Sequence, residues 1–286
     1  MSTVSKSLLP AVESFLGRDA HGGFVGGQSL LSSSGSTIAT CDPGTGSTLA
    51  EVTAMTAEEI NQAVDVANDA FKKTGWSTMP VNERCALLHR LADAVQKNIA
   101  TVAQIESLDA GKVESQAAGD VQNFCDTMRY FADMALHMNP RTTLAAKGHQ
   151  AWTYRQPWGA CAFIFPWNFP FLLIGWGISP ALAAGNTVVI KPAEDTPLSA
   201  IFLAELAKEV GIPDGVINVV TGSGETAGAA LSANPNIKRM SFTGSPEVGR
   251  LVGESCGRNL VPVKLCLLYT SPSPRDATLS RMPSSA

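Results

Sequence analysis

The sequence Phe165-Pro166-Trp167-Asn168-Phe169-Pro170 stands between an apolar run, residues 160–165, and a second one, residues 171–184. Each proline fixes φ and removes a backbone donor, so the two cannot both lie inside one regular strand or helix. The residue before each proline is also driven out of the helical region. The hexapeptide is therefore predicted to be an irregular loop where a buried strand passes into a buried helix. We interpret it as the place where a cofactor and a reacting carbonyl meet.

Asn168 is the side chain of this loop that is suited to chemistry. An amide donates hydrogen bonds without adding net charge, so Asn168 is a candidate donor to a developing oxyanion. Asn is also a preferred residue at the N-cap of a helix, and the hexapeptide taken alone favours that simpler role.

The composition is that of a folded α/β protein rich in alanine and glycine. The 286 residues suffice for two modest domains. Of these, 45% are hydrophobic and 16% are charged, which argues against a disordered chain. The net charge is −4 and no basic block occurs. Nucleic acid and anionic membrane surfaces are therefore not expected as partners.

The six cysteines are scattered without a C-x-x-C pair, and the four histidines show no metal-ligand spacing. This pattern predicts reduced thiols, no metal site and a cytoplasmic location. Residues 1–15 hold one lysine and only isolated apolar residues, so they lack the apolar core of a signal peptide. We expect residues 1–20 to form a frayed N-terminal arm.

One long uncharged run, between Arg155 and Lys191, leaves a membrane span as an alternative. Four prolines, three polar amide residues and four glycines break the run into pieces that are too short to cross a bilayer. A buried strand followed by a buried helix is the favoured interpretation, with no membrane contact.

The pattern of the first half of the chain predicts hairpins followed by helices. Residues 21–54 alternate short β-like pieces with turns such as Asp42-Pro43-Gly44. Thr56 followed by Glu59 forms a capping-box pattern that opens a helix. Apolar residues at helical spacing recur up to about residue 131 and predict further helices, none of which carries evident catalytic residues. In residues 142–157 the pattern changes from helical spacing to strand-like alternation, which predicts a hairpin that leaves the domain.

From residue 160 onward, strands and helices alternate regularly. Strands are predicted at residues 160–165, 187–190, 216–220 and 239–242, with helices between them and after the last. Alternation of this kind predicts a parallel sheet with helices on both faces. Ligands of such sheets bind at the carboxyl ends of the strands.

Three of these strand ends carry polar or glycine-rich turns, namely residues 191–194 (KPAE), 221–224 (TGSG) and 243–245 (TGS). Ser245 followed by Pro246 predicts a capped helix N-terminus, which is an anion site suited to a pyrophosphate. The G-x-G-x-x-G fingerprint is absent, and ordinary β–α capping would explain each turn alone.

Taken together, the loop and the turns resemble those of the NAD(P)-dependent aldehyde dehydrogenase superfamily, and betaine-aldehyde-like members in particular. The resemblance covers about His21 to Leu265. It implies a Rossmann-like, parallel-sheet domain that binds the cofactor NAD. Together with a catalytic domain, which this chain lacks, such a domain would form an enzyme that oxidises aldehydes. It also implies that Asn168 binds the oxyanion and that Lys191 and Glu194 bind the adenosine ribose. The cofactor-lining positions implied are Ile164, Pro166, Trp167, Asn168, Lys191, Glu194, Gly224, Gly228, Phe242, Gly244, Ser245 and Val248.

The resemblance has further consequences for ligands and organisation. The carboxylate of Glu194 would repel a 2′-phosphate, so NAD is expected rather than NADP. An aldehyde substrate and a homo-oligomer are implied for the full-length enzyme. The expected divisions are residues 1–20 (arm), 21–139 (first part of the cofactor domain), 140–157 (hairpin of the oligomerisation region), 158–265 (NAD-binding core) and 266–286 (tail outside the family).

The sequence departs from the family at two places. Gly177 stands where many members carry a lysine, which puts one ribose or phosphate contact in doubt. From Cys266 onward the family pattern stops, so that Cys266 occupies the position of the general base. Neither that base nor the nucleophilic cysteine is matched. The chain is therefore expected to be a truncated, inactive fragment. A noncatalytic nucleotide-binding or interaction protein is the alternative.

Overall fold

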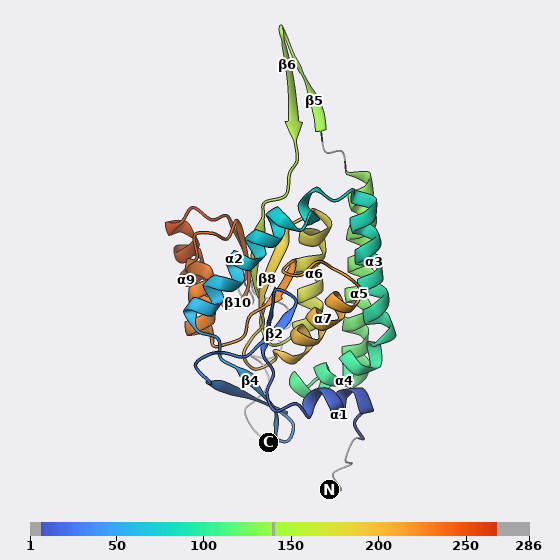
Figure 1. Cartoon of the computed structure of the whole chain (residues 1–286), viewed down its shortest axis with the longest axis vertical. Helices are drawn as coiled ribbons and strands as arrows, with labels where there is room; N and C mark the ends of the chain where they lie inside the picture. Colours follow the sequence, from blue (N-terminus) through green and yellow to red (C-terminus); the bar gives the residue numbers. More distant parts are fainter. Residues whose placement is uncertain (1–6, 139–140, 268–286) are drawn as a thin grey trace, which may run out of the picture.

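The computed structural model describes residues 7–138 and 141–267. A seven-stranded sheet lies at its centre with helices on both faces (Figure 1). The strand order is β11-β10-β7-β8-β9-β1-β2. The first five strands are parallel, and β1 and β2 complete the sheet in the antiparallel sense. The strand bounds are β1 Gly23–Val25, β2 Gln28–Leu30, β7 Ala160–Ile164, β8 Thr187–Lys191, β9 Ile217–Val219, β10 Arg239–Gly244 and β11 Val263–Leu267.

Alternation of side chains along the parallel strands divides the core in two. Cys161 and Phe163 of β7 belong to one hydrophobic cluster, and Ala160 and Ala162 belong to the other. Successive strand residues point to opposite faces, so a strand that is apolar at every position must be covered on both sides.

The two faces are covered by different helices. The first cluster packs under α1 (Pro10–Leu16), α3 (Val81–Lys97), α4 (Ile99–Asp109), α5 (Glu114–His137), α6 (Pro170–Ala183) and α7 (Leu198–Glu209). The second packs under α2 (Ala57–Lys73), α8 (Ala229–Ala233) and α9 (Pro246–Arg258). Short turns of other helix types lie at η1 (Trp76–Thr78) and η2 (Gly224–Gly228).

Two hairpins lie outside the main sheet. One pairs β3 (Thr37–Cys41) with β4 (Thr48–Thr53). The other pairs β5 (Arg141–Ala146) with β6 (His149–Tyr154) and projects away from the body (Figure 1). Trp152 and Tyr154 are exposed on this projection. An isolated two-stranded hairpin is only marginally stable in water.

The N-terminal prediction is wrong over residues 10–16. This stretch forms α1, whose Val12 and Phe15 are buried, rather than a frayed arm. The two side chains are three residues apart, so they share one helix face and bury together. Residues 1–6 lie outside the described part of the chain.

The predicted elements of the second half are present, with shifts of one or two residues at several ends. β8 includes Lys191, and β10 continues to Gly244. β11 pairs in parallel with β10 as far as Leu267, so ordered sheet extends past the predicted boundary at residue 265. The remainder of the predicted tail, residues 268–286, lies outside the described residues.

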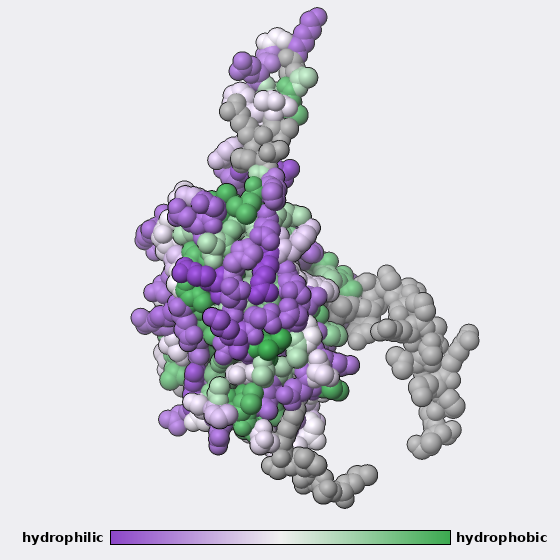
Figure 2. Space-filling view, turned by 90° about the vertical axis from the view of Figure 1, so that its right-hand side faces the viewer, coloured by the Kyte–Doolittle hydropathy of each residue, from purple (hydrophilic) through white to green (hydrophobic). Residues whose placement is uncertain are grey.

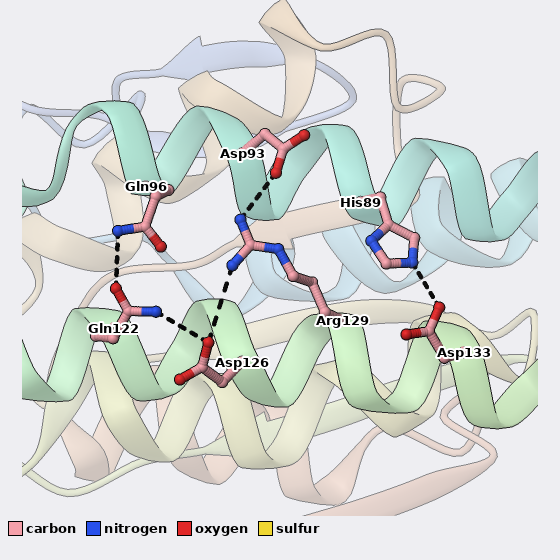
Figure 3. A network of polar contacts seen from close by, with 7 residues as sticks. All are labelled: His89, Asp93, Gln96, Gln122, Asp126, Arg129 and Asp133. Atoms are coloured by element: carbon pink, nitrogen blue, oxygen red, sulfur yellow. Dashed lines mark hydrogen bonds and ion pairs between the residues drawn. The ribbon is translucent and has the colours of Figure 1, made fainter.

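A polar ladder joins α3 to α5 on the outer surface (Figure 3). Arg129 bonds Asp93 at 2.8 Å, and His89 bonds Asp133 at 2.8 Å. Seen from the side of these helices, the body is largely hydrophilic (Figure 2). In the described residues, no helix is long and apolar enough to span a membrane.

Candidate functional site

The carboxyl ends of β10, β7, β8 and β9 lie side by side along one edge of the sheet. Ile164 at the end of β7 is in register with Lys191 of β8 and with Phe242 of β10. Because these strands are parallel neighbours, the turns that follow them open at the same edge. The positions predicted at residues 164–168, 191–194, 224 and 242–248 are thereby brought to one edge.

Lys191 and Glu194 form a fixed pair at this edge. Lys191 is only 2% exposed, and its Nζ donates to Oε2 of Glu194 over 2.7 Å. The other carboxylate oxygen, Oε1, accepts the backbone N–H of Gly224 over 3.1 Å. The turn after β8 is thereby tied to the turn after β9 through Glu194.

The charge of Glu194 is stabilised in this arrangement. Partial burial works to raise the pKa of its carboxyl group, but the hydrogen bond and positive charge of Lys191 and the N–H of Gly224 outweigh it. The net pKa is below the ordinary value, so Glu194 is an anion at neutral pH. A small cavity behind it is lined by Ile38, Val52, Thr53, Pro192, Ala193, Glu194, Pro197, Thr221 and Gly222.

The turn after β10 presents the N-terminus of α9. Ser245 is the N-cap, and its side chain accepts the N–H of Val248, as the sequence predicted. A β carbon at Gly244 would lie 2.6 Å from Cζ of Phe242, so a larger residue here would displace that ring. Val248 is exposed on the first turn of the helix. The helix N-terminus presents the positive end of the helix dipole at this edge.

Gly224 and Gly228 bound the single π-helical turn η2. Ser223 caps this turn by accepting the N–H of Thr226 over 3.2 Å. Gly224 is exposed and Gly228 is buried. Of these two positions, the exposed one adjoins Glu194.

The hexapeptide is a loop between β7 and α6, as predicted. Its first residue, Phe165, donates its N–H to the carbonyl oxygen of Lys191 over 3.1 Å. Pro166 is partly buried, and Trp167 is 59% exposed. The loop therefore leaves β7 close to the Lys191–Glu194 pair.

The structure discriminates between the two roles considered for Asn168. The N-cap of α6 is Phe169, and no side chain caps it, so Asn168 does not perform that role. Its Oδ1 is buried without a hydrogen-bond partner among the described residues. A buried acceptor that the described residues leave unpaired calls for an explanation outside the fold, such as a bound ligand.

The sequence did not single out the buried acids of α4. Glu106 is fully buried, and its Oε2 accepts the N–H of Phe171 at the start of α6 over 3.4 Å. Asp109 accepts the N–H of Leu198 at the start of α7 over 3.0 Å. Burial raises the pKa of both carboxyl groups, that of Asp109 to about 7. Their i, i+3 spacing on an otherwise uncharged helix was the available signal.

The four buried cysteines of the described chain are not activated nucleophiles. Burial raises the pKa of Cys161 to about 12 and that of Cys125 and Cys256 to about 11, and it also raises the pKa of Cys85. Such thiols stay protonated at neutral pH. Cys41 and Cys266 are exposed. No cluster of three or more potential metal ligands occurs among the described residues.

An open groove runs between α5 and α6. It is lined by Asp126, Thr127, Tyr130, Phe131 and Trp176. Tyr130 and Trp176 are both more than half exposed, and Nε1 of Trp176 donates to Oδ1 of Asn123 over 2.9 Å. The groove presents aromatic surface on the same helix that begins beside Asn168.

The fold places the chain among the NAD-binding α/β domains of oxidoreductases, whose cofactor lies at the carboxyl ends of parallel strands. It belongs to the aldehyde dehydrogenase family, whose sequence profile matches residues 30–268. It is 41% identical over 283 residues to a phenylacetaldehyde dehydrogenase of Pseudomonas fluorescens, covering 95% of this chain and 55% of that protein. It is 42% identical over 250 residues to a mitochondrial benzaldehyde dehydrogenase of Antirrhinum majus, covering 87% and 47%.

Solved structures support the same assignment. The NAD⁺ complex of an aldehyde dehydrogenase from Bacillus cereus matches with a TM-score of 0.90 and 36% identity, covering 93% of this chain and 54% of that one. A betaine aldehyde dehydrogenase from Staphylococcus aureus in complex with NAD⁺ matches with a TM-score of 0.86 and 28% identity, covering 90% and 51%. This chain thus spans about half the length of the relatives it matches.

Proposed function

We propose that this chain is the NAD-binding half of an NAD-dependent aldehyde dehydrogenase, which converts an aldehyde, NAD and water to a carboxylate and NADH. The observation that carries the proposal is the Lys191–Glu194 pair, tied to Gly224 and adjoining an exposed loop on one sheet edge. The residues fit the cofactor because Asn168 Oδ1 is buried without a partner in the described part of the chain and α9 begins with a capped N-terminus at the same edge.

Different residues bind different parts of the dinucleotide. Glu194 and Lys191 are placed to bind the ribose hydroxyls of the adenosine, one as acceptor and one as donor. Ser245 and the N-terminus of α9 are placed to bind the pyrophosphate. The other residues of the proposed pocket are Ile164, Pro166, Trp167, Gly224, Gly228, Phe242, Gly244 and Val248. NAD, when bound, accepts the hydride.

Asn168 acts on the substrate carbonyl. Its amide N–H donates to the oxygen that becomes negative when a nucleophile adds to the aldehyde. Donors aimed at developing charge contribute more in the transition state than in the ground state. The aromatic groove beside Trp176 is a candidate path for the aldehyde, and the identity of that aldehyde is left open.

The chain by itself is expected not to oxidise aldehydes. The reaction needs a thiolate and a base for the deacylating water, and we assign neither to a residue of this chain. Cys266 is exposed on β11, at the position that the resemblance assigns to the general base. Absorbance of NADH should not appear with short, aromatic or quaternary-ammonium aldehydes. NADH formation that is abolished by Cys266→Ala would identify Cys266 as the nucleophile and overturn this expectation.

The β5–β6 hairpin is the proposed contact of the full-length homo-oligomer. It projects from the body, exposes Leu144, Trp152 and Tyr154, and forms a two-stranded sheet of its own. The edges of such a sheet are templates for pairing with another chain. The six free cysteines suit a reducing compartment, and we propose the cytoplasm.

Calorimetric titration of the folded chain with NAD tests the proposal, with circular dichroism to establish folding. Binding should be detectable in the millimolar range or below, and Lys191→Met should weaken it by about tenfold or more through loss of a charged hydrogen bond. Lys73→Met, which breaks an exposed ion pair on α2, is the matched control and should leave binding unchanged. A folded chain that takes up no NAD would favour the alternative of an interaction protein.

A further inference from the structure

Lys112, in the loop between α4 and α5, lies against the start of α6. Its Nζ is 4.1 Å from the centroid of the Phe169 ring, in a cation–π contact. The same Nζ is 2.5 Å from Oδ2 of Asp120 and 4.0 Å from Oε2 of Glu106. The Lys112 side chain is only 11% exposed. A buried lysine held between two acids has few alternative positions, so the cation is fixed over the ring.

Glu106 extends this arrangement to the other side of Pro170. It accepts the N–H of Phe171 over 3.4 Å and the hydroxyl of Ser199 over 2.5 Å. Phe169 and Phe171 flank Pro170, and both are contacted by the same group of side chains. The segment after Asn168 is therefore held through its backbone by Glu106 of α4 and through the Phe169 ring by Lys112, which Asp120 of α5 holds in turn.

Without the Lys112 contact, the surroundings of Phe169 do little to restrict the orientation of its side chain. Its side chain is 43% exposed, and its backbone adopts φ −141° and ψ 63° as the uncapped N-cap of α6. Burial of the remaining part of the ring is favourable but non-directional, so it does not by itself select one orientation. The contact with Lys112 is the polar interaction that selects one orientation of this ring.

We propose that Lys112 is a positioning residue for Asn168: through Phe169 it fixes the hexapeptide loop so that the amide of Asn168 points at the reacting carbonyl. Lys112 acts through the ring and touches neither substrate nor cofactor. The role in turnover rests on the proposed aldehyde dehydrogenase activity. The effect on the loop does not.

The experiment uses the full-length protein with Lys112→Met, which keeps the aliphatic stem and removes the cation. We expect kcat to fall by about tenfold or more, because small displacements of a catalytic donor are costly. KM for NAD should stay within about twofold, since the Lys191–Glu194 pair is untouched. Lys112→Arg restores a cation over the ring and should recover most of kcat. Lys73→Met is again the control.

A second readout does not depend on activity. With fluorine-labelled tryptophan, the resonance of Trp167, assigned by its loss in Trp167→Phe, reports on the loop. It should shift or broaden in Lys112→Met and return in Lys112→Arg. Phe169→Leu should produce the same change, and the double variant should add nothing to it, because both substitutions remove one contact.

The outcomes separate the two proposals. An unchanged Trp167 resonance and an unchanged kcat in folded Lys112→Met would overturn the positioning role. Additive effects of Lys112→Met and Phe169→Leu would overturn it also. If the unmodified full-length protein oxidises no aldehyde, the proposed function fails, while the fluorine measurement still decides whether Lys112 holds the loop.

Discussion

Gly177 of α6 lies directly against the ring of Phe165, the first residue of the hexapeptide. A β carbon at position 177 would be 2.7 Å from Cζ of Phe165 and 3.1 Å from Cδ1 of Phe163. The two phenylalanine rings are stacked with centroids 5.8 Å apart, so neither can move without disturbing the other. In this chain the ring of Phe165 thus occupies the space that the first atom of a side chain at position 177 would need.

Gly177→Ala should destabilise the protein although alanine is the better helix former. We expect a loss of about 1–3 kcal/mol from overpacking, and Phe165→Leu in the same background should return part of it. A β carbon at Gly119 of α5 would meet open space in the described part of the chain, so Gly119→Ala should be neutral or stabilising. Denaturant unfolding of the single and double variants measures the coupling. Strict additivity would contradict the contact.

Glu194→Thr should reduce the preference for NAD over NADP. The carboxylate is charged at neutral pH, and two like charges near a protein surface repel by about 1–4 kcal/mol. We expect the ratio of the two dissociation constants to change by about tenfold or more. Glu225→Thr, at an exposed neighbouring carboxylate, is the control. Equal effects of the two substitutions would show that Glu194 does not face the ribose.

Asn168→Ala should separate activity from stability in the full-length enzyme. Loss of an oxyanion donor lowers kcat by about 10²–10³. The melting temperature should not fall, because Oδ1 of Asn168 is buried without a partner among the residues described. Asn186 is the contrast: its Oδ1 accepts the N–H of Trp158 over 2.6 Å and of Gly159 over 3.1 Å. Asn186→Ala should destabilise the fold, and a melting temperature lowered equally in both variants would count against the assignment.

Glu59 should make the fold sensitive to acid. Burial opposes its ionisation, but hydrogen bonds from the N–H groups of Ser33 and Thr56 and from the hydroxyls of Ser32 and Ser33 outweigh this and lower its pKa from 4.5 to about 2. A depressed pKa stabilises the folded state above pH 4.5, and this stability is lost as the pH falls toward 2. The shift corresponds to at most about 3 kcal/mol.

Glu59→Gln should therefore lower the free energy of unfolding at pH 7 and flatten its dependence on pH between about 4.5 and 2. Glu58→Gln, on the more exposed side of the same helix turn, should leave that dependence in place. Urea unfolding across this pH range is the measurement. Parallel pH profiles for wild type and Glu59→Gln would refute the role of the carboxylate.

Helix caps could be predicted from the sequence because the residues that form each cap are close together in the chain. Thr56 and Glu59 exchange hydrogen bonds three residues apart, and Ser245 caps a helix three residues on. The apolar strands from residue 160 onward require helices on both faces wherever they lie in the sheet. The caps rest on interactions that a few consecutive residues complete by themselves, and the strand prediction rests on a pattern visible within each strand.

The alternation of strands and helices, the loop at Asn168 and the turns that follow three strands could all be predicted from the amino-acid pattern. The contacts of Glu194 with Gly224, of Glu106 with Phe171 and of Lys112 with Phe169 became visible only in the folded chain. The same holds for the place of Val12 and Phe15 in the core. These contacts join segments far apart in the chain. They form only once the strand order has brought those segments together, and no local pattern encodes that order.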